Sequence, residues 1–210
     1  MRPVSPIRPR SVIVKLGGSL LAGPPPRLLL QRLARQPGAI LVPGGGSFAD
    51  AVRDAQPRLE LSEAACHAMA ILAMEQTAYA LADLCPALAP CRSEADLAAP
   101  RSGAALWFPA ALLLRASEIP ETWDVTSDSL ALWLAARLGA PRLVLVKAPG
   151  TAIPQAPAVT DLAALAAAGL VDRAFPQMAR GFAGTIVLVN ADDSARLEAA
   201  LGTGAEMDPR

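Results

Sequence analysis

Two short hydrophobic runs that each end in a glycine turn constrain the fold of this 210-residue chain most strongly. Residues 12–14 form the continuous apolar stretch expected of a strand covered on both faces, and they lead to Lys15 and a glycine pair. Residues 39–42 repeat the pattern and lead to the turn at residues 43–48, while leucines at helical spacing predict a helix over residues 27–35. Strand, helix and strand in this order predict a parallel α/β sheet with both turns at one edge.

The first glycine turn predicts an anion site. Gly17 and Gly18 carry no Cβ, so the backbone N–H groups there can approach a phosphate, and Lys15 would supply positive charge. Neither turn matches the P-loop or the dinucleotide-binding glycine pattern. A solvated lysine beside an ordinary turn also explains the first turn, and a flexible turn also explains residues 44–46.

Composition excludes several classes of partner. Lys plus Arg and Asp plus Glu both number 19, so no overall field recruits nucleic acid or an acidic membrane surface. Hydrophobic residues make up 53% of the chain, but no run reaches the ~20 residues of a membrane helix. Three cysteines without metal-ligand spacing favour the reducing cytoplasm. We expect a soluble protein, and we interpret residues 1–10, which lack the apolar stretch of a secretory signal, as an irregular leader.

The rest of the chain continues the alternation of helices and strands. Hydrophobic periodicity predicts further helices or helical turns over residues 48–58, 61–84, 93–97, 110–114, 126–138, 161–168 and 194–201. Short apolar or β-branched runs predict further strands over residues 88–91, 104–108, 142–147 and 184–190.

The segment 123–130 adds polar groups just before the predicted helix. Thr126, Ser127 and Asp128 are residues whose oxygens accept the free N–H groups of a first helical turn. Capping needs only one of them, and Asp124 adds a second carboxylate. The strand that follows this helix ends in Lys147, as the first strand ends near Lys15. Both lysines are therefore expected at the carboxyl edge of one sheet, with an acidic cluster beside them.

His67, the one histidine of the sequence, leaves two interpretations open. It lies on the apolar face of the helix predicted over residues 61–84, where a lone histidine is usually a hydrogen-bonded core residue. Glu63, one turn earlier, would then be its partner. The alternative is a contact with a ligand.

Four segments in combination resemble the amino acid kinase family. They are Lys15 with the glycines at 17–18, residues 44–46, residues 124–128 and the strand leading to Lys147, and the likeness extends over about residues 12–190. The resemblance implies a three-layer α/β/α sandwich with a mainly parallel central sheet. It implies one domain over residues 1–210, with an acceptor-side lobe (1–122) and a nucleotide-side lobe (123–210). We also expect a homo-oligomer, in the cytoplasm that the cysteine content favours.

Within that family, the chain looks most like the small kinases that phosphorylate aminomethylfuran methyl phosphate in methanofuran biosynthesis. The likeness lies in residues 43–51, 67–75 and 123–134. Two stretches depart from the family pattern: residues 148–157, where an acidic residue before the glycine is missing and the segment is short, and the abbreviated tail 202–210, where a closing strand is expected to be missing.

The resemblance also implies roles for individual residues in an ATP- and Mg²⁺-dependent transfer of a phosphoryl group. The catalytic residues it implies are Lys15, Asp128 and Lys147. Besides the two lysines, the phosphate- and nucleotide-binding residues are Gly17, Gly18, Ser19, Asp124, Thr126, Ser127 and Gly150. The acceptor-binding residues are Gly44, Gly45, Gly46, Ser47 and His67. The sequence names no metal ligand.

The small-molecule acceptor is expected to carry a phosphate already, because a phosphate oxygen is a competent nucleophile near neutral pH and needs no general base. Two other classes of function compete with a kinase. One is a non-catalytic module of the same fold that binds an anion or nucleotide, although such a module has no need to organise two cations around an aspartate. The other is a dinucleotide-binding domain, which the missing glycine fingerprint disfavours.

Overall fold

A computed structural model describes residues 11–155 and 158–202 of the chain. The expectations for residues 1–10 and for the tail beyond residue 202 lie outside the described residues, as does part of the expected short segment 151–157.

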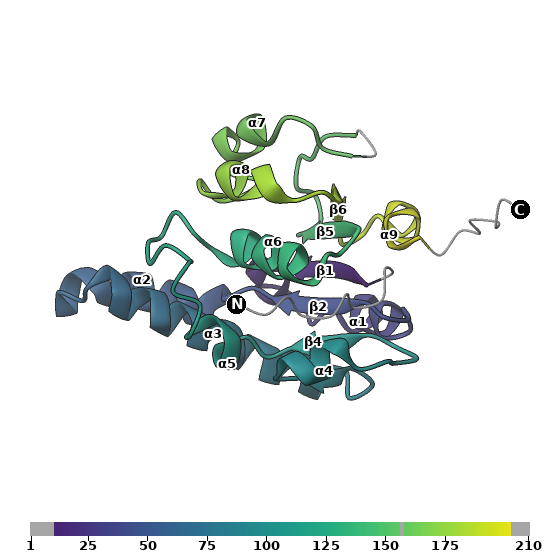
Figure 1. Ribbon diagram of the computed structural model, residues 1–210, viewed down its shortest axis with the longest axis horizontal. Coiled ribbons are helices and arrows are strands. Elements are labelled where there is room, and N and C mark those ends of the chain that lie inside the picture. Colours follow the sequence, from purple (N-terminus) through teal and green to yellow (C-terminus); the bar gives the residue numbers. More distant parts are fainter. Residues whose placement is uncertain (1–10, 156–157, 203–210) are drawn as a thin grey trace, which may run out of the picture.

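Over the described residues, six parallel strands form one sheet in the order β3-β4-β2-β1-β5-β6, which runs from β4 near the bottom to β6 near the top of Figure 1. The strands are β1 (Val12–Leu16), β2 (Ile40–Pro43), β3 (Ala89–Cys91), β4 (Ala105–Trp107), β5 (Arg142–Lys147) and β6 (Thr185–Asn190). In the central register, Ile13 of β1 pairs with Ile40 of β2 and with Leu143 of β5. The predicted strands are confirmed.

Helices connect the strands. They are α1 (Arg27–Ala34), α2 (Gly46–Leu59), α3 (Glu63–Leu84), α4 (Glu94–Ala98), α5 (Ala110–Leu113), α6 (Ser127–Leu138), α7 (Leu162–Ala167), α8 (Phe175–Met178) and α9 (Ser194–Leu201). The start of α2 differs from the prediction, because two residues of the glycine turn, Gly46 and Ser47, already form its first turn. None of the described helices is both long enough and apolar enough to cross a membrane.

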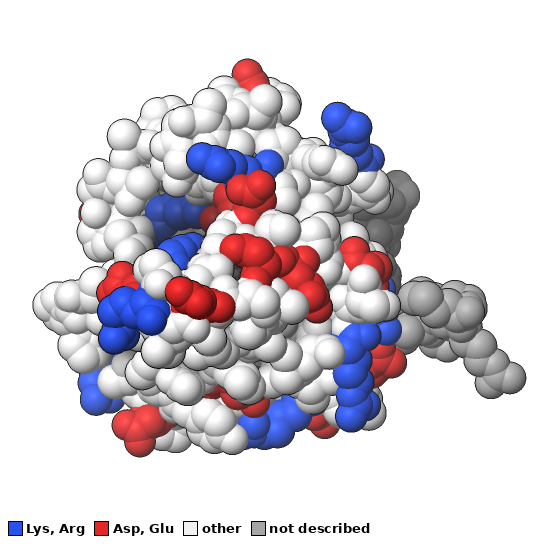
Figure 2. Space-filling model, turned by 90° about the vertical axis from the view of Figure 1, so that its left-hand side faces the viewer, with Lys and Arg blue, Asp and Glu red and all other residues white. Residues whose placement is uncertain are grey.

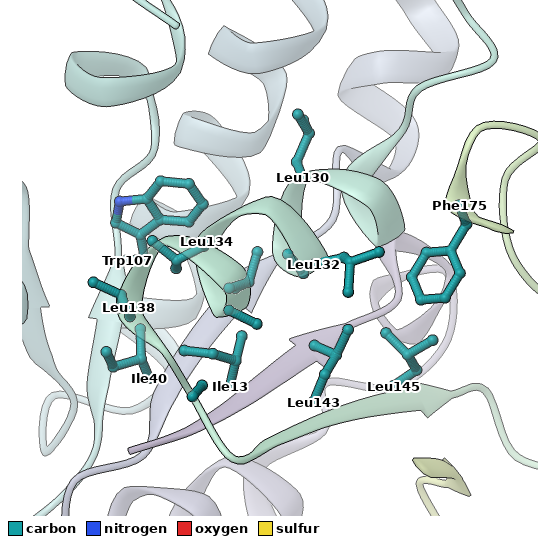
Figure 3. Close-up of a cluster of buried hydrophobic side chains, with 14 of the residues drawn as sticks. Ile13, Ile40, Trp107, Leu130, Leu132, Leu134, Leu138, Leu143, Leu145 and Phe175 are labelled. Carbon is teal, nitrogen blue, oxygen red and sulfur yellow. The ribbon is translucent and has the colours of Figure 1, made fainter. Parts of the chain in front are cut away.

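The inner strands β4, β2, β1 and β5 bury both faces, as their continuous apolar sequence predicts, while Ala89 and Pro90 of the edge strand β3 are exposed. Alternate residues of each strand point to opposite faces, so Ile13 and Val14 belong to two separate clusters of buried side chains. Figure 3 shows Ile13, Leu143 and Leu145 rising from β1 and β5 towards α6. Helices α6 and α8 cover this face, while α1 and α9 cover the other. The three-layer α/β/α architecture is confirmed.

The strand order places a topological switch at β1. The chain passes from β1 to β2 on one side, and later returns to pair β5 on the other side of β1. In open α/β sheets, ligands bind in the crevice beyond the carboxyl ends of the strands at such a switch. The carboxyl ends of β1, β2 and β5 are therefore the place to look for a site.

Candidate active site

A buried carboxylate holds two lysines together at this edge. Lys15 and Lys147 occupy the same strand phase as Ile13 and Leu145, so their side chains point to the face that α6 covers. Asp128, in the first turn of α6, lies 2.9 Å from the Lys15 Nζ and 3.2 Å from the Lys147 Nζ. The Asp128 and Lys15 side chains are only 9% and 6% exposed. The predicted grouping of these three residues is confirmed.

Lys15 and Lys147 are the only two lysines of the sequence, and its other positively charged side chains are arginines. Lysine is a compact point charge whose pKa responds to burial, whereas arginine stays charged throughout the accessible pH range. The choice of lysine at two positions, with arginine elsewhere, is a sequence signal independent of the pattern of strands and turns. It singles out Lys15 and Lys147 without knowledge of the fold.

Opposing effects set the charge of this cluster. Burial would raise the pKa of Asp128, but the two lysines outweigh burial and hold that pKa below its ordinary value. The pKa of Lys147 is lowered, first by burial and then by Lys15, while Asp128 and Asp172 oppose the change. The carboxylate therefore stays ionised and holds two cations in place, where a polyanion such as a nucleoside triphosphate can bind to them.

The two glycine turns touch each other through their backbones. A Cβ added to Gly18 would lie 2.3 Å from the Gly46 backbone nitrogen, and one added to Gly44 would lie 2.5 Å from the Gly18 nitrogen. The Gly17 N–H also donates to the Val146 carbonyl of β5 at 3.1 Å. Glycine is thus needed at these positions so that the two loops can contact each other. Neither of the two interpretations drawn from the sequence, a flexible turn or close approach to a ligand, included this reason.

A cavity of about 390 Å³ opens beside both loops. Figure 2 shows a recess on one face of the molecule, with basic side chains inside it and acidic side chains next to them. The predicted acceptor-binding residues on the cavity wall are Gly45, Gly46, Ser47 and His67, while Gly44 is buried rather than on the wall. The predicted nucleotide-binding residues on the same wall are Gly18, Ser19, Thr126 and Ser127. The cavity therefore lies where the two sets of predicted residues meet.

His67 is half-buried on the cavity wall, without a hydrogen bond in the described structure. Glu63, its expected partner, instead accepts a hydrogen bond from the Gln56 side chain at 2.9 Å. Burial lowers the pKa of His67, and the smaller effect of Glu121 opposes that change. The hydrogen-bonded core interpretation is therefore wrong, and the imidazole is available to the cavity.

Sequence reasoning missed three charged or aromatic residues on the cavity wall, Asp50, Arg53 and Trp123. Arg53 and Asp50 of α2 form an ion pair at 3.3 Å, and the Arg53 guanidinium lies 4.5 Å from the centroid of the Trp123 ring. The Trp123 indole also donates to the Gln56 side chain at 2.6 Å. These contacts join the segment before α6 to helix α2.

Two predicted nucleotide-binding residues lie apart from the lysine cluster. The exposed Asp124 carboxylate pairs with Arg173 at 3.6 Å. Gly150 is exposed in the turn after β5 and has a positive φ of 74°. That turn is closed by the Thr151 hydroxyl, which donates to the Ala148 carbonyl at 2.7 Å.

The cap of α6 differs from the prediction. Thr126 occupies the N-cap position, but its side chain accepts no cap hydrogen bond and instead donates to Asp172 at 2.9 Å. The Asp172 carboxylate accepts the N–H groups of Thr126 and Ser129, and Asp128 points to the lysines. The prediction that residues 126–128 cap their own helix is therefore wrong, because a carboxylate from a distant segment takes that role.

The described residues offer no ready-made magnesium site. They contain no group of three His, Cys, Asp or Glu side chains placed to hold a metal ion. Both Asp128 oxygens already contact lysine. Magnesium is commonly held by substrate phosphates and water with few protein carboxylates. An ion required by the reaction would therefore be held mainly by the phosphates of a nucleotide.

No protein-family model matches the chain. The chain is 27% identical, over 194 residues, to a (5-(aminomethyl)furan-3-yl)methyl phosphate kinase of Methanocaldococcus jannaschii, which covers 85% of this chain and 87% of that protein.

Solved structures share the fold. The uridylate kinase of Archaeoglobus fulgidus superposes with a TM-score of 0.61 at 17% identity, over 90% of this chain and 96% of that chain. The UMP kinase of Ureaplasma parvum superposes with a TM-score of 0.67 at 12% identity, over 97% and 96% of the two chains. The predicted resemblance to the amino acid kinase family is confirmed by these likenesses together with the curated relative, which is a kinase.

Proposed function

We propose that this protein transfers the γ-phosphoryl group of ATP to a small acceptor that already carries a phosphate, of the aminomethylfuran methyl phosphate type and as part of methanofuran biosynthesis. The observation that carries the proposal is the buried cluster in which Asp128 fixes Lys15 and Lys147 beside a cavity. The acceptor class is supported by the name of the 27% identical relative.

The geometry suits phosphoryl transfer because this reaction depends on positioning and on neutralising charge. Lys15 and Lys147 would contact the phosphate oxygens that gain charge in the transition state. Asp128 keeps both ammonium groups in place before substrate binds. The N–H groups of the first glycine loop and of the α2 N-terminus add donors on either side. Magnesium bound to the ATP phosphates would supply further neutralisation.

The chemical step needs no proton transfer if the acceptor is a phosphate monoester. An acceptor oxygen forms a bond to the γ-phosphorus, while the bond from that phosphorus to the β–γ bridging oxygen breaks and ADP leaves with the electron pair. The product is a diphosphate ester, and the total charge is conserved. This accounts for a site whose central carboxylate is held by two lysines and is not free to act as a base.

The direct test is acceptor-dependent formation of ADP by the purified full-length chain. We expect ADP and a diphosphate ester in equal amounts with ATP, Mg²⁺ and aminomethylfuran methyl phosphate, and much slower turnover with the unphosphorylated alcohol. Tight ATP binding without ADP formation from any phosphate monoester would instead establish a non-catalytic binding module.

Replacing His67 with Ala should raise the acceptor KM about tenfold and leave the ATP KM nearly unchanged, as expected for loss of a hydrogen bond to a charged group. The acceptor phosphate would raise the lowered pKa of His67, so acceptor binding should take up a proton and weaken as pH climbs through the pKa of the complex. Steady-state kinetics with each substrate varied between about pH 6 and 9 measure both effects.

Two variants make the His67 experiment specific. His67→Gln keeps an N–H donor but cannot titrate, so it should retain part of the affinity and lose the pH dependence. Met69→Ala changes an exposed position of the same helix and should change neither KM. Equal changes in both KM values for His67→Ala would assign the histidine a structural role.

The Asp50–Arg53 pair places one charge of each sign on the cavity wall, which favours an acceptor with both a phosphate and an amine. Asp50→Asn should raise the KM of the amine-bearing acceptor by about fivefold, the scale of an exposed ion pair, and leave an amine-free analogue unaffected. Asp54→Asn, one turn further on the exposed face of α2, is the matched control. An identical response of the two acceptors would exclude Asp50 from recognition.

A homo-oligomeric state, a cytoplasmic location and separate acceptor-side and nucleotide-side lobes remain part of the proposal. One sheet includes strands from both proposed lobes, with β1 to β4 in residues 1–122 and β5 and β6 in residues 123–210. The cavity lies where they meet, because Gly45 and His67 come from the first lobe and Thr126 and Ser127 from the second.

A further inference from the structure

Asp172 accepts five hydrogen bonds at the start of α6. Its carboxylate receives the Thr126 N–H and hydroxyl, both at 2.9 Å, and the Ser129 N–H at 3.0 Å. It also receives the Ser129 hydroxyl, and the Phe175 N–H at 3.0 Å. Asp172 lies in the segment between α7 and α8, so one side chain joins that segment to the first turn of α6.

This arrangement differs from the other aspartate caps of the molecule. Asp161 and Asp193 each accept the N–H of a residue three positions later and cap the helix that they precede. At α6 the hydroxyl of the N-cap residue, Thr126, instead donates a hydrogen bond to Asp172. The negative charge of Asp172 therefore lies at the N-terminus of a 12-residue helix, where the helix dipole favours it.

The first turn of α6 determines where Asp128 lies. Asp128 stands between Thr126 and Ser129, the two residues whose backbone and hydroxyl groups Asp172 holds. A small shift of this turn would move the Asp128 carboxylate relative to both lysines. Errors of about 1 Å in the position of a reacting or orienting group can cost on the order of a hundredfold in rate.

We propose that Asp172 is a positioning residue of the phosphoryl-transfer site, which fixes the first turn of α6 and thereby the place of Asp128 between Lys15 and Lys147. The kinetic part of this inference rests on the proposed kinase function. The structural part does not, because the arrangement of the two lysines can be measured without turnover.

The charge of Asp172 gives the proposal a signature that a purely structural cap lacks. The groups that act on Lys147 are Lys15 from β1, Asp128 from α6 and Asp172. Burial and Lys15 lower the pKa of Lys147, whereas Asp128 and Asp172 raise it. Loss of the Asp172 charge should therefore lower this pKa further. Activity that needs charged Lys147 would then decline at a lower pH on the alkaline side.

The experiment uses Asp172→Asn, which keeps the shape of the side chain and part of its hydrogen bonding. Protein labelled with ¹³C at the lysine ε-carbons gives two side-chain signals, since the chain has only two lysines, and Lys15→Met assigns them. We expect the Lys147 signal of Asp172→Asn to titrate at lower pH than in the wild type. We also expect kcat to fall by roughly tenfold to a hundredfold, with a smaller change in either KM.

Two further variants separate charge from capping. Asp193→Asn makes the same substitution at the cap of α9 and should alter neither the Lys147 titration nor kcat. Ser129→Ala removes one hydrogen bond from Asp172 but keeps its charge, so the Lys147 titration should stay close to the wild type. It also remains informative if Asp172→Asn folds poorly, because a strong downward shift of the Lys147 pKa in Ser129→Ala would contradict the assignment to the Asp172 charge.

The outcomes separate the two levels of inference. If the wild type forms no ADP with any phosphorylated acceptor, the proposed function fails, while the lysine titration still tests the role of Asp172. If the wild type is active, and Asp172→Asn keeps both its kcat and its Lys147 titration, Asp172 is not a positioning residue. A loss of kcat matched by Asp193→Asn, with unchanged lysine signals, would overturn the inference in the same way.

Discussion

Replacing Asp128 with Asn should lower turnover by at least about a hundredfold, the loss typical of removing one preorganised electrostatic contact. The variant leaves two buried lysines without their shared counter-charge, and breaking a buried ion pair in this way costs roughly 3–5 kcal/mol. For a chain of this size, that cost corresponds to a fall in Tm of about 10 °C. If Asp128 served only as a helix cap, almost no change in Tm would follow, because Asn caps as well as Asp.

ATP provides a second signature of this variant. Its phosphates can replace the missing counter-charge, so the shift in Tm that ATP produces should be at least as large in Asp128→Asn as in the wild type. Asp83→Asn is the matched control, since it makes the same substitution at an exposed aspartate of α3 and should preserve both Tm and turnover. Near-normal turnover in Asp128→Asn would remove Asp128 from the mechanism.

Lys15→Met is expected to lose about 3 kcal/mol of transition-state stabilisation, on the order of a hundredfold in turnover. Its effect on folding should be smaller than that of Asp128→Asn, because Asp128 keeps Lys147 as a partner at 3.2 Å. Methionine also fills most of the buried volume that the lysine stem occupies. Steady-state turnover and thermal unfolding, measured on the same preparation, separate the two effects.

Arg142→Met is a suitable control for Lys15→Met. It removes a cation at the amino end of β5, where the Arg142 guanidinium donates to the Ala200 carbonyl at 2.7 Å, far along the strand from the site. We expect some loss of stability and normal turnover. If the two variants lose turnover equally, the effect of Lys15 is not specific to the chemistry.

Local sequence patterns predicted most of the architecture. The apolar runs at β1, β2 and β5 are short, continuous and bounded by glycine or proline, so both their type and their burial could be recognised. Lys15 and Lys147 could be placed together because parallel strands bring their carboxyl ends to one edge. The role of Asp128 between them was implied by the resemblance to the amino acid kinase family and not by backbone direction.

The features that the sequence did not predict are contacts between segments that are distant along the chain. Asp172 lies 46 positions from Thr126, in a segment for which the sequence indicates no site residue. Arg53 looks solvated on its own helix, and its packing on Trp123 exists only in three dimensions. The contact between the two glycine loops is likewise a tertiary distance, in which Gly18 and Gly46 meet across neighbouring strands.

The restriction of lysine to the site makes the protein unusually simple to label. Apart from the terminal α-amine, the primary amines of the chain are those of Lys15 and Lys147, both largely shielded from solvent. An amine-reactive ATP analogue, such as an acyl phosphate, is therefore expected to modify the two lysines of the proposed nucleotide site with little background elsewhere on the chain. One modified peptide per chain, protected by ATP, would map the nucleotide directly, whereas conventional lysine crosslinking would report little about assembly.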